Sequence, residues 1–287
     1  MGNKAGFGYC KLTGNYGRYV KSHIIPEALT ETLWKGKGPL IQRGGNGRRV
    51  RLGQTSWYDR GLVTADGEAI LSKCDSWAIE FFRERKLIWS SWGVMEELEL
   101  PDHEWGPERQ FGYRKLENVD SDRLRLFFLS LLWRAAVTTR YEFSVVSLSP
   151  EELDQLRDMV VSGQVEPYHF YPAVLMQFST RNFPHNMAAG RSVKYEPIFD
   201  PDTGLPSQET GREIQYYRFF FDGLVAHVHI NDDAAHVEGL GSSIVGGRSE
   251  ILLATMPSEY TGHMKHLWNE MGMAEPPSSL TRRCHLF

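Results

Sequence analysis

The segment Cys10–Pro26 places the strongest constraint on how this chain can fold. It contains one thiol, then a glycine-containing turn, then a run with β-branched residues that ends at His23 and Pro26. Such a run favours a strand. Proline is tolerated in the first turn of a helix, and Glu27 suits the positive end of the helix dipole. The order therefore predicts a knuckle and a strand, followed by a helix at about 27–35.

The stretch 61–86 supplies a second strand and helix. Asp66-Gly67 is a pair typical of tight hairpins, and it separates two short apolar runs. Apolar residues then recur over Cys74–Lys86, which predicts a helix. Asp75 would lie near the N-terminus of that helix, with His23 across a strand.

A basic, glycine-rich loop is expected between these halves, at 36–53. No acidic residue interrupts its cations, which are Lys35, Lys37, Arg43, Arg48, Arg49 and Arg51. Glycines let backbone N–H groups approach phosphates, and arginines bind phosphates in a bidentate manner. The loop therefore predicts a grip on nucleic acid. A solvated loop without a particular partner is the alternative.

The remaining sequence predicts an α+β fold with a buried helical middle and an antiparallel β-rich C-terminal module. Asp120–Val137 is apolar on every side and predicts a buried helix. Ser149-Pro-Glu-Glu152 has the pattern of a capping box. Strands are expected at 171–179, 193–199, 214–230 and 249–256, with a hairpin-like connection at 200–204 and a short helix at 258–271. The predicted domains are 1–92, an acidic and irregular linker at 93–119, and 120–287.

Composition excludes several classes of protein. A formal net charge of −4 argues against a generally basic coat for nucleic acid, although it allows a local basic patch. The longest apolar run, Leu126–Trp133, is too short to span a bilayer, so no membrane partner is expected. Three widely spaced cysteines make no disulfide framework, and no signal peptide is evident. We therefore expect a cytoplasmic protein.

Three short motifs in residues 9–86 resemble the HNH-endonuclease superfamily. They are Cys10-x-x-Thr13, Ser22-His23-Ile-Ile-Pro26 and Leu71-x-x-Cys74-Asp75. The closest resemblance is to a bacterial group in which Cys-x-x-Cys precedes Ser-His-Ile-Ile-Pro and a second Cys-x-x-Cys precedes an acidic residue. The resemblance implies a ββα-metal finger and, by analogy, a setting in bacterial defence or mobile elements.

The resemblance also implies roles for particular residues. His23 would be the general base, Asp75 a ligand of a divalent metal such as Mg²⁺, and Asp66 would lie near the asparagine that orients the histidine, with metal binding as a lesser role. The implied function is binding of DNA or RNA with metal-dependent cleavage of phosphodiesters. The C-terminal module would then dock a protein partner or select the target.

The chain departs from the family pattern at several positions. Thr13 and Leu71 replace two of the four thiols, so Cys10 and Cys74 remain as a remnant. Two thiolates cannot close a tetrahedral zinc site, and a structural zinc is not expected. Ser22 stands where many HNH enzymes have an aspartate. The alternative function is accordingly a catalytically inactive interaction or scaffold protein that keeps the finger fold.

A second hypothesis comes from His227 and His229. At i and i+2 on a strand they point to the same face, a spacing used by metal sites in β-barrels. This favours a metal-binding β-domain. The alternative is a half-buried strand whose histidines occupy its more polar face.

Overall fold

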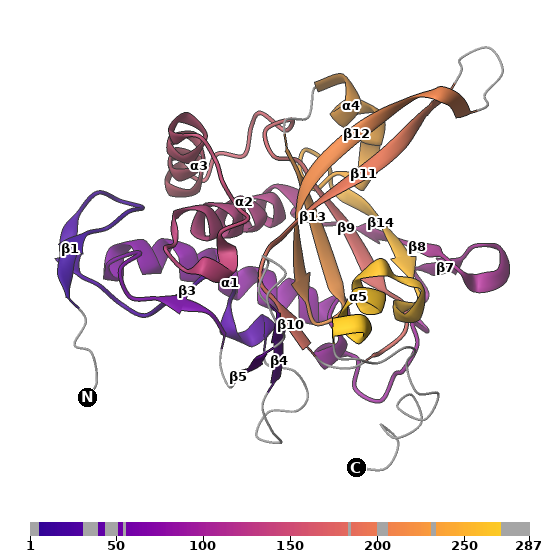
Figure 1. The fold of residues 1–287 in the computed structure, drawn as a ribbon, viewed down its shortest axis with the longest axis horizontal. Coiled ribbons are helices and arrows are strands. Elements are labelled where there is room, and N and C mark those ends of the chain that lie inside the picture. The colour runs from indigo at the N-terminus through magenta and orange to yellow at the C-terminus, as the bar shows by residue number, and fades with distance from the viewer. Residues whose placement is uncertain are drawn as a thin grey trace.

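The computed structural model describes residues 6–30, 40–43, 51–53, 56–182, 185–199, 206–230 and 234–270. Within these residues, helices pack on a large seven-stranded sheet (Figure 1). Its strands run in the order β11 (Gly190–Phe199), β12 (Pro206–Phe221), β13 (Leu224–His229), β9 (Ala173–Phe178), β14 (Glu250–Met256), β8 (Gly112–Glu117) and β7 (His103–Trp105). Neighbouring strands are antiparallel except β9 and β14, which are parallel. The α+β class is therefore confirmed, with a mixed rather than a purely antiparallel sheet.

Smaller sheets lie beside this one. They are the hairpin of β1 (Phe7–Tyr9) with β2 (Tyr16–Arg18), the antiparallel pair of β3 (Ser22–His23) with β6 (Tyr58–Asp59), and β10 (His185–Met187) with β4 (Leu40–Arg43) and β5 (Arg51–Gly53). The last two strands correct the prediction that 36–53 is all loop. Of the helix predicted at 27–35, the described part is a 3-10 turn at Glu27–Leu29.

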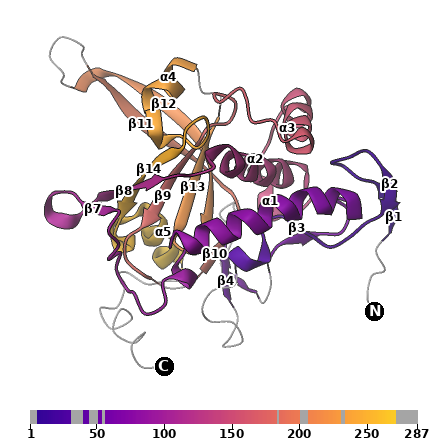
Figure 2. The same ribbon diagram turned by 180° about the vertical axis from the view of Figure 1, so that it is seen from behind.

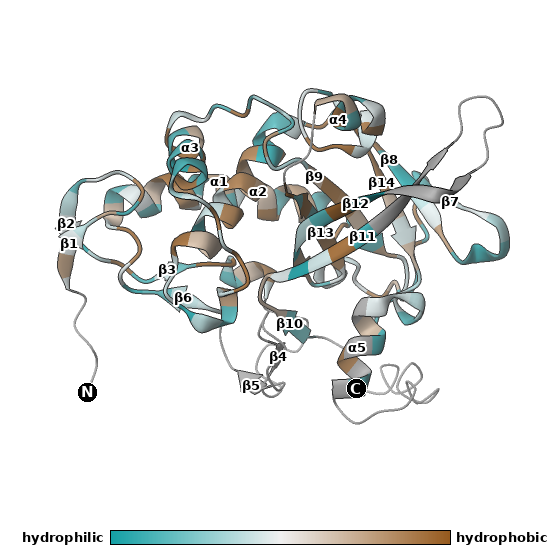
Figure 3. Cartoon of the chain, turned by 45° about the horizontal axis from the view of Figure 1, so that its top comes forward, coloured by the Kyte–Doolittle hydropathy of each residue, from teal (hydrophilic) through white to brown (hydrophobic). Residues whose placement is uncertain are grey.

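Both faces of the large sheet are covered, as the alternation of aromatic residues along β12 shows. Phe219 and Phe221 join the core formed with α1 (Ala65–Glu84) and α2 (Ser121–Val137), whereas Phe220 joins a second cluster that includes residues of α5 (Gly262–Glu270). Figure 2 shows α1 and α2 side by side on their side of the sheet. In Figure 3, brown ribbon marks the apolar residues along α2 and β9.

The predicted middle helices are confirmed. The side chain of Asp120 caps α2 by accepting a hydrogen bond from the Arg123 amide at 3.0 Å. Ser149 and Glu152 form the expected capping box at the start of α3 (Pro150–Ser162). The helix expected at 258–271 is a 3-10 turn at Ser258–Tyr260 followed by α5. The remaining helix is α4 (Ala234–Leu240), and no helix of the described residues is long and apolar enough to cross a membrane.

The strand expected at 214–230 is two strands, β12 and β13, because a turn interrupts the apolar run. Asp222 and Gly223 both have positive φ, at 48° and 95°, a geometry that suits a two-residue hairpin turn. The Asp222 carboxylate accepts a hydrogen bond from the Ser90 amide at 2.7 Å, which fixes the turn against the preceding segment. The connection predicted at 200–204 lies outside the described residues.

The prediction of an irregular linker at 93–119 is wrong where β7 and β8 lie. β8 alternates buried and exposed residues, but its central inward residue is Arg114, which hides the strand pattern in the sequence. One hydrophobic cluster includes both Cys10 and Leu253, so the predicted N-terminal and C-terminal modules share a core.

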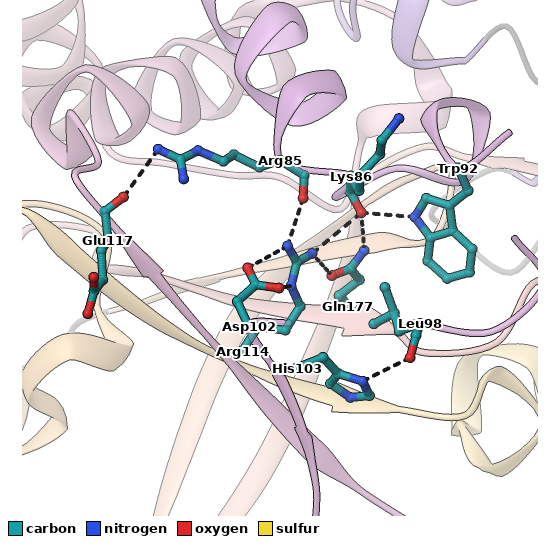
Figure 4. Close-up of polar contacts among 9 residues, drawn as sticks. All are labelled: Arg85, Lys86, Trp92, Leu98, Asp102, His103, Arg114, Glu117 and Gln177. Atoms are coloured by element: carbon teal, nitrogen blue, oxygen red, sulfur yellow. Dashed lines mark hydrogen bonds and ion pairs between the residues drawn. The ribbon is translucent and has the colours of Figure 1, made fainter. Parts of the chain in front are cut away.

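Arg114 is buried because its guanidinium has a complete set of acceptors (Figure 4). It donates to Asp102 at 2.8 Å, to the Gln177 side chain at 2.7 Å and to the backbone carbonyl of Arg85 at 2.8 Å. These bonds tie β8 and β9 to the C-terminal end of α1. The network therefore fixes the helix that carries Asp75 relative to the sheet.

The hairpin predicted at Asp66-Gly67 is also wrong, because both residues lie in the first turn of α1. Gly67 is required there by a close contact and not by a turn: a Cβ at this position would lie 2.6 Å from the Cys10 Sγ. Asp66 and Glu68 suit the positive end of the helix dipole. Asp75 consequently lies in the middle of a 20-residue helix and not at its start.

Candidate functional site around His23

Two short strands, β3 and β6, precede α1, but β6 lies before the stretch 61–71 in which the sequence predicts the second strand, and most of that stretch belongs to α1. His23 pairs with Tyr58 across the two short strands, and the Ile24 amide donates to the Trp57 carbonyl at 2.9 Å. The chain enters α1 a few residues after β6. His23 is thus held on a short strand whose partner leads directly into the helix that carries Asp75.

The His23 side chain is 20% exposed and its Nε2 lies 3.7 Å from the Glu27 carboxylate. Its ring meets the Tyr58 ring edge to face, with 6.2 Å between the centroids. Burial lowers the pKa of His23, the Lys21 charge lowers it further, and Glu27 opposes both. The imidazole is therefore neutral at pH 7. Its buried Nε2 has no hydrogen-bond partner among the described residues.

Arg134 joins the two residues that the sequence singles out. It lies on α2, is 1% exposed, and donates to the two carboxylate oxygens of Asp75 at 2.7 and 2.8 Å. It also donates to the backbone carbonyl of His23 at 3.0 Å. The structure therefore brings Asp75 and β3 together, and the carboxylate is neutralised by a guanidinium.

Glu68 lies two helical turns before Asp75, on the same face of α1. Burial raises the pKa of Glu68, while the Ser22 hydroxyl and the Arg134 charge oppose this rise. Ser22 itself is buried. Sequence reasoning missed both Glu68 and Arg134; the signal for Arg134 was a single cation in the otherwise uncharged stretch after Arg125, which needs a buried partner.

The Mg²⁺ ion that the resemblance implies does not fit this arrangement. Asp75 is committed to Arg134 through both oxygens. Over the residues that the structure describes, no group of three or more histidine, cysteine, aspartate and glutamate side chains could hold a metal. The predicted base and the predicted ligand are thus a neutral imidazole and a carboxylate paired with a guanidinium.

Asp66 lies at the knuckle, away from the place expected of it. Its carboxylate accepts hydrogen bonds from Thr64, from Asn15 at 2.7 Å and from Thr13 at 2.9 Å. These bonds, that of Thr64 foremost, hold the pKa of Asp66 well below its ordinary value. Nine residues of helix separate Asp66 from Asp75, roughly 13 Å along the axis. Asp66 therefore braces the knuckle and does not orient His23.

The two remaining thiols do not share a site. Cys10 is buried against Gly67, and its Sγ accepts a hydrogen bond from the Thr13 amide at 3.4 Å. Cys74 lies seven residues beyond Gly67 on α1, about 10 Å further along the helix. Burial raises the pKa of the Cys74 thiol. Both thiols are free and act as packing residues.

Most of the predicted phosphate-binding residues lie outside the described part of the chain. They are Lys35, Lys37, Arg48 and Arg49. The backbones of Arg43 and Arg51 lie on the antiparallel strands β4 and β5. The grip itself stays a prediction.

His227 and His229 lie on β13, on the face opposite Ala226 and Val228, which belong to the main core. The His227 ring contacts that of Tyr216, with centroids 4.3 Å apart. Burial, with the charge of Arg218, lowers the pKa of His227 to about 3. The alternation that the sequence offered as the alternative to a metal site is present, but the strand is not half-buried: every residue of β13 except His227 is buried. The neighbouring Asp232 and Asp233 lie outside the described residues.

Comparisons of the chain with protein-family models, with curated proteins and with solved structures find no match.

Proposed function

We propose that this protein binds nucleic acid on the surface beside His23, using a ββα arrangement in which Arg134 takes the place of a metal ion. The observation that carries the proposal is the convergence of two cations on one ring next to His23. Lys21 lies over the Tyr58 ring at 4.6 Å and Arg60 at 5.4 Å from its centroid. Both cations are exposed, so they are available to phosphates.

The charge distribution of the N-terminal segment supports this surface. The first 26 residues contain Lys4, Lys11, Arg18 and Lys21 but no aspartate or glutamate. A local cationic patch on a protein of net charge −4 concentrates an anionic ligand at one place. The His23 ring lies beside these cations and is partly exposed, although its Nε2 is buried.

Binding without cleavage is the form of the function that the contacts favour. Metal-dependent hydrolysis needs a cation beside the scissile phosphate, held by free carboxylate or imidazole ligands. The pairing of Asp75 with Arg134 removes the carboxylate expected to hold that ion. The protein would thus keep the finger as a binding scaffold.

The test is a binding assay with fluorescently labelled DNA and RNA, together with a cleavage assay in Mg²⁺ or Mn²⁺. We expect Lys21→Ala and Arg60→Ala to weaken binding, whereas Lys265→Ala, an exposed lysine on α5, leaves it unchanged. We expect no cleavage by the wild type. Cleavage that is lost in His23→Ala would overturn the non-catalytic form of the proposal, and failure of the wild type to bind any nucleic acid would overturn the function.

A further inference from the structure

The β1–β2 hairpin carries three aromatic rings on its outer face. Phe7 pairs with Arg18 and Tyr9 with Tyr16, and partners in an antiparallel pair project to the same side. Phe7, Tyr9 and Tyr16 are 66%, 69% and 66% exposed. They contact one another: the Tyr16 ring lies edge to face with Tyr9 at 5.3 Å and stacks on Phe7 at 6.3 Å between centroids, yet most of each residue's surface stays exposed to solvent.

The inner face of the hairpin carries the glycines Gly8 and Gly17. There is no room on that face for a larger side chain, so the rings occupy the outer face. A Cβ on Gly8 would lie 2.6 Å from the Tyr19 ring, and one on Gly17 would lie 3.2 Å from the Thr64 side chain. The backbone therefore packs directly on the protein. The outer face is left to the three rings and Arg18.

The hairpin is held firmly to the start of α1. The Lys11 amide donates to the Leu62 carbonyl at 3.0 Å and the Val20 amide to the Val63 carbonyl at 3.2 Å. The Tyr19 hydroxyl donates to the Tyr9 carbonyl at 2.9 Å. The rings are thus presented on a fixed surface at the end of the molecule away from β7 (Figures 1 and 3). A fixed surface loses little conformational entropy when a ligand binds.

The hairpin's own charges favour an anionic occupant. Arg18 lies on the ring face itself, Lys21 follows it by three residues, and the first 26 residues of the chain contain no acidic residue. The Asp66 carboxylate lies at the loop between the two strands, where it accepts hydrogen bonds from Thr13 and Asn15. A ligand that combines flat apolar groups with regular negative charges matches this surface. Unpaired nucleotides have both, whereas the bases of a duplex are stacked inside it.

We propose that Phe7, Tyr9 and Tyr16 form a stacking platform for the unpaired bases of single-stranded nucleic acid, with Arg18 and Lys21 contacting its phosphates. This inference rests on the proposed function and specifies the class of nucleic acid that the protein binds. His23 follows Arg18 by five positions, so the backbone of the platform's Arg18 lies within about 18 Å of that of His23. One bound strand therefore reaches both.

The experiment compares a labelled twelve-nucleotide oligothymidylate with a twenty-base-pair duplex at the same salt concentration. Phe7→Ala, Tyr9→Ala and Tyr16→Ala should each weaken single-strand binding about fivefold or more, the lower end for one lost base stack. Duplex binding should stay within about twofold of the wild type. Tyr9→Phe and Tyr16→Phe keep the rings and should bind the single strand as the wild type does.

Two controls keep these results interpretable. Tyr260→Ala removes a ring that is 55% exposed on a distant element, and it should leave binding unchanged. The unfolding temperature of each hairpin variant should match that of the wild type, because the rings are exposed.

Three outcomes would overturn the platform. The first is that the alanine variants of Phe7, Tyr9 and Tyr16 bind the single strand as the wild type does, whereas the Lys21 and Arg60 variants bind it more weakly. That result would refute the platform and leave the proposed function intact. The second is equal loss of single-strand and duplex binding. The third is a dimer, seen by light scattering, that depends on the rings and excludes the oligonucleotide, because a second copy would then be the occupant.

Discussion

Replacing Arg134 by methionine tests the contact that holds β3 against α1. The wild-type guanidinium makes two hydrogen bonds to Asp75, at 2.7 and 2.8 Å, and one to the His23 carbonyl at 3.0 Å. Methionine has a similar length and fills the apolar surroundings without a charge. The variant therefore leaves the Asp75 carboxylate and the His23 carbonyl without this donor.

Removing one partner of a buried ion pair costs about 3–5 kcal/mol. Asp75 is 15% exposed, so water can solvate part of the stranded carboxylate. We accordingly expect the free energy of unfolding to fall by about 3 kcal/mol, at the lower end of that range. Arg134→Lys keeps the charge but loses the bidentate geometry, and an intermediate loss is expected.

The assay is urea unfolding followed by tryptophan fluorescence. The informative control is Arg134→Met combined with Asp75→Leu, which removes both charges and should recover most of the lost stability. A loss below about 1 kcal/mol for Arg134→Met would refute the reasoning. So would a double variant that is no more stable than the single one.

Three further predictions concern the knuckle and β13. Because the pKa of Asp66 is lowered in the fold, its carboxylate stabilises the protein above about pH 4. The difference in urea midpoint between wild type and Asp66→Asn should therefore shrink as the pH falls further. A difference that does not depend on pH would contradict this. Gly67→Ala should lower the free energy of unfolding by about 1–3 kcal/mol, because the added Cβ overlaps the Cys10 Sγ. Adding Cys10→Ala to this variant should recover that loss. A Gly67→Ala variant that is more stable than the wild type would show that helix propensity dominates. NMR titration should find the His227 imidazole neutral down to about pH 4. Because burial disfavours the protonated ring, the contribution of His227 to the free energy of unfolding should rise with pH between about 3 and 6.5. Protonation of His227 near pH 6 would contradict this.

The parts of the fold that could be predicted from sequence are those with strong local signals. The apolar run of α2 and the capping box of α3 depend on residues close together in the chain. The hairpin expected at Asp66-Gly67 failed because Gly67 serves a contact with Cys10, more than fifty residues away. β8 was missed because the partners of its inward-facing Arg114 lie on other elements.

For the site, the sequence predicted Asp75 at the start of a helix with His23 across a strand, whereas Asp75 lies in the middle of α1 and is joined to the His23 carbonyl through Arg134. The sequence could not show this connection, since Arg134 comes from a helix almost sixty residues beyond Asp75. The motif alone therefore favoured a metal ligand where the structure has an ion pair. The hairpin rings were missed because alternation of aromatic residues with glycine looks the same whether the rings face solvent or a core.

The most direct test of the account is the salt dependence of oligonucleotide binding. We predict that the wild type binds the labelled single strand, and that the slope of log K against log salt concentration falls by about one for each of Lys21→Ala and Arg60→Ala, while Lys265→Ala leaves it unchanged. Equal slopes for all four proteins, or no binding by the wild type, would contradict the claim that the surface beside His23 holds nucleic acid.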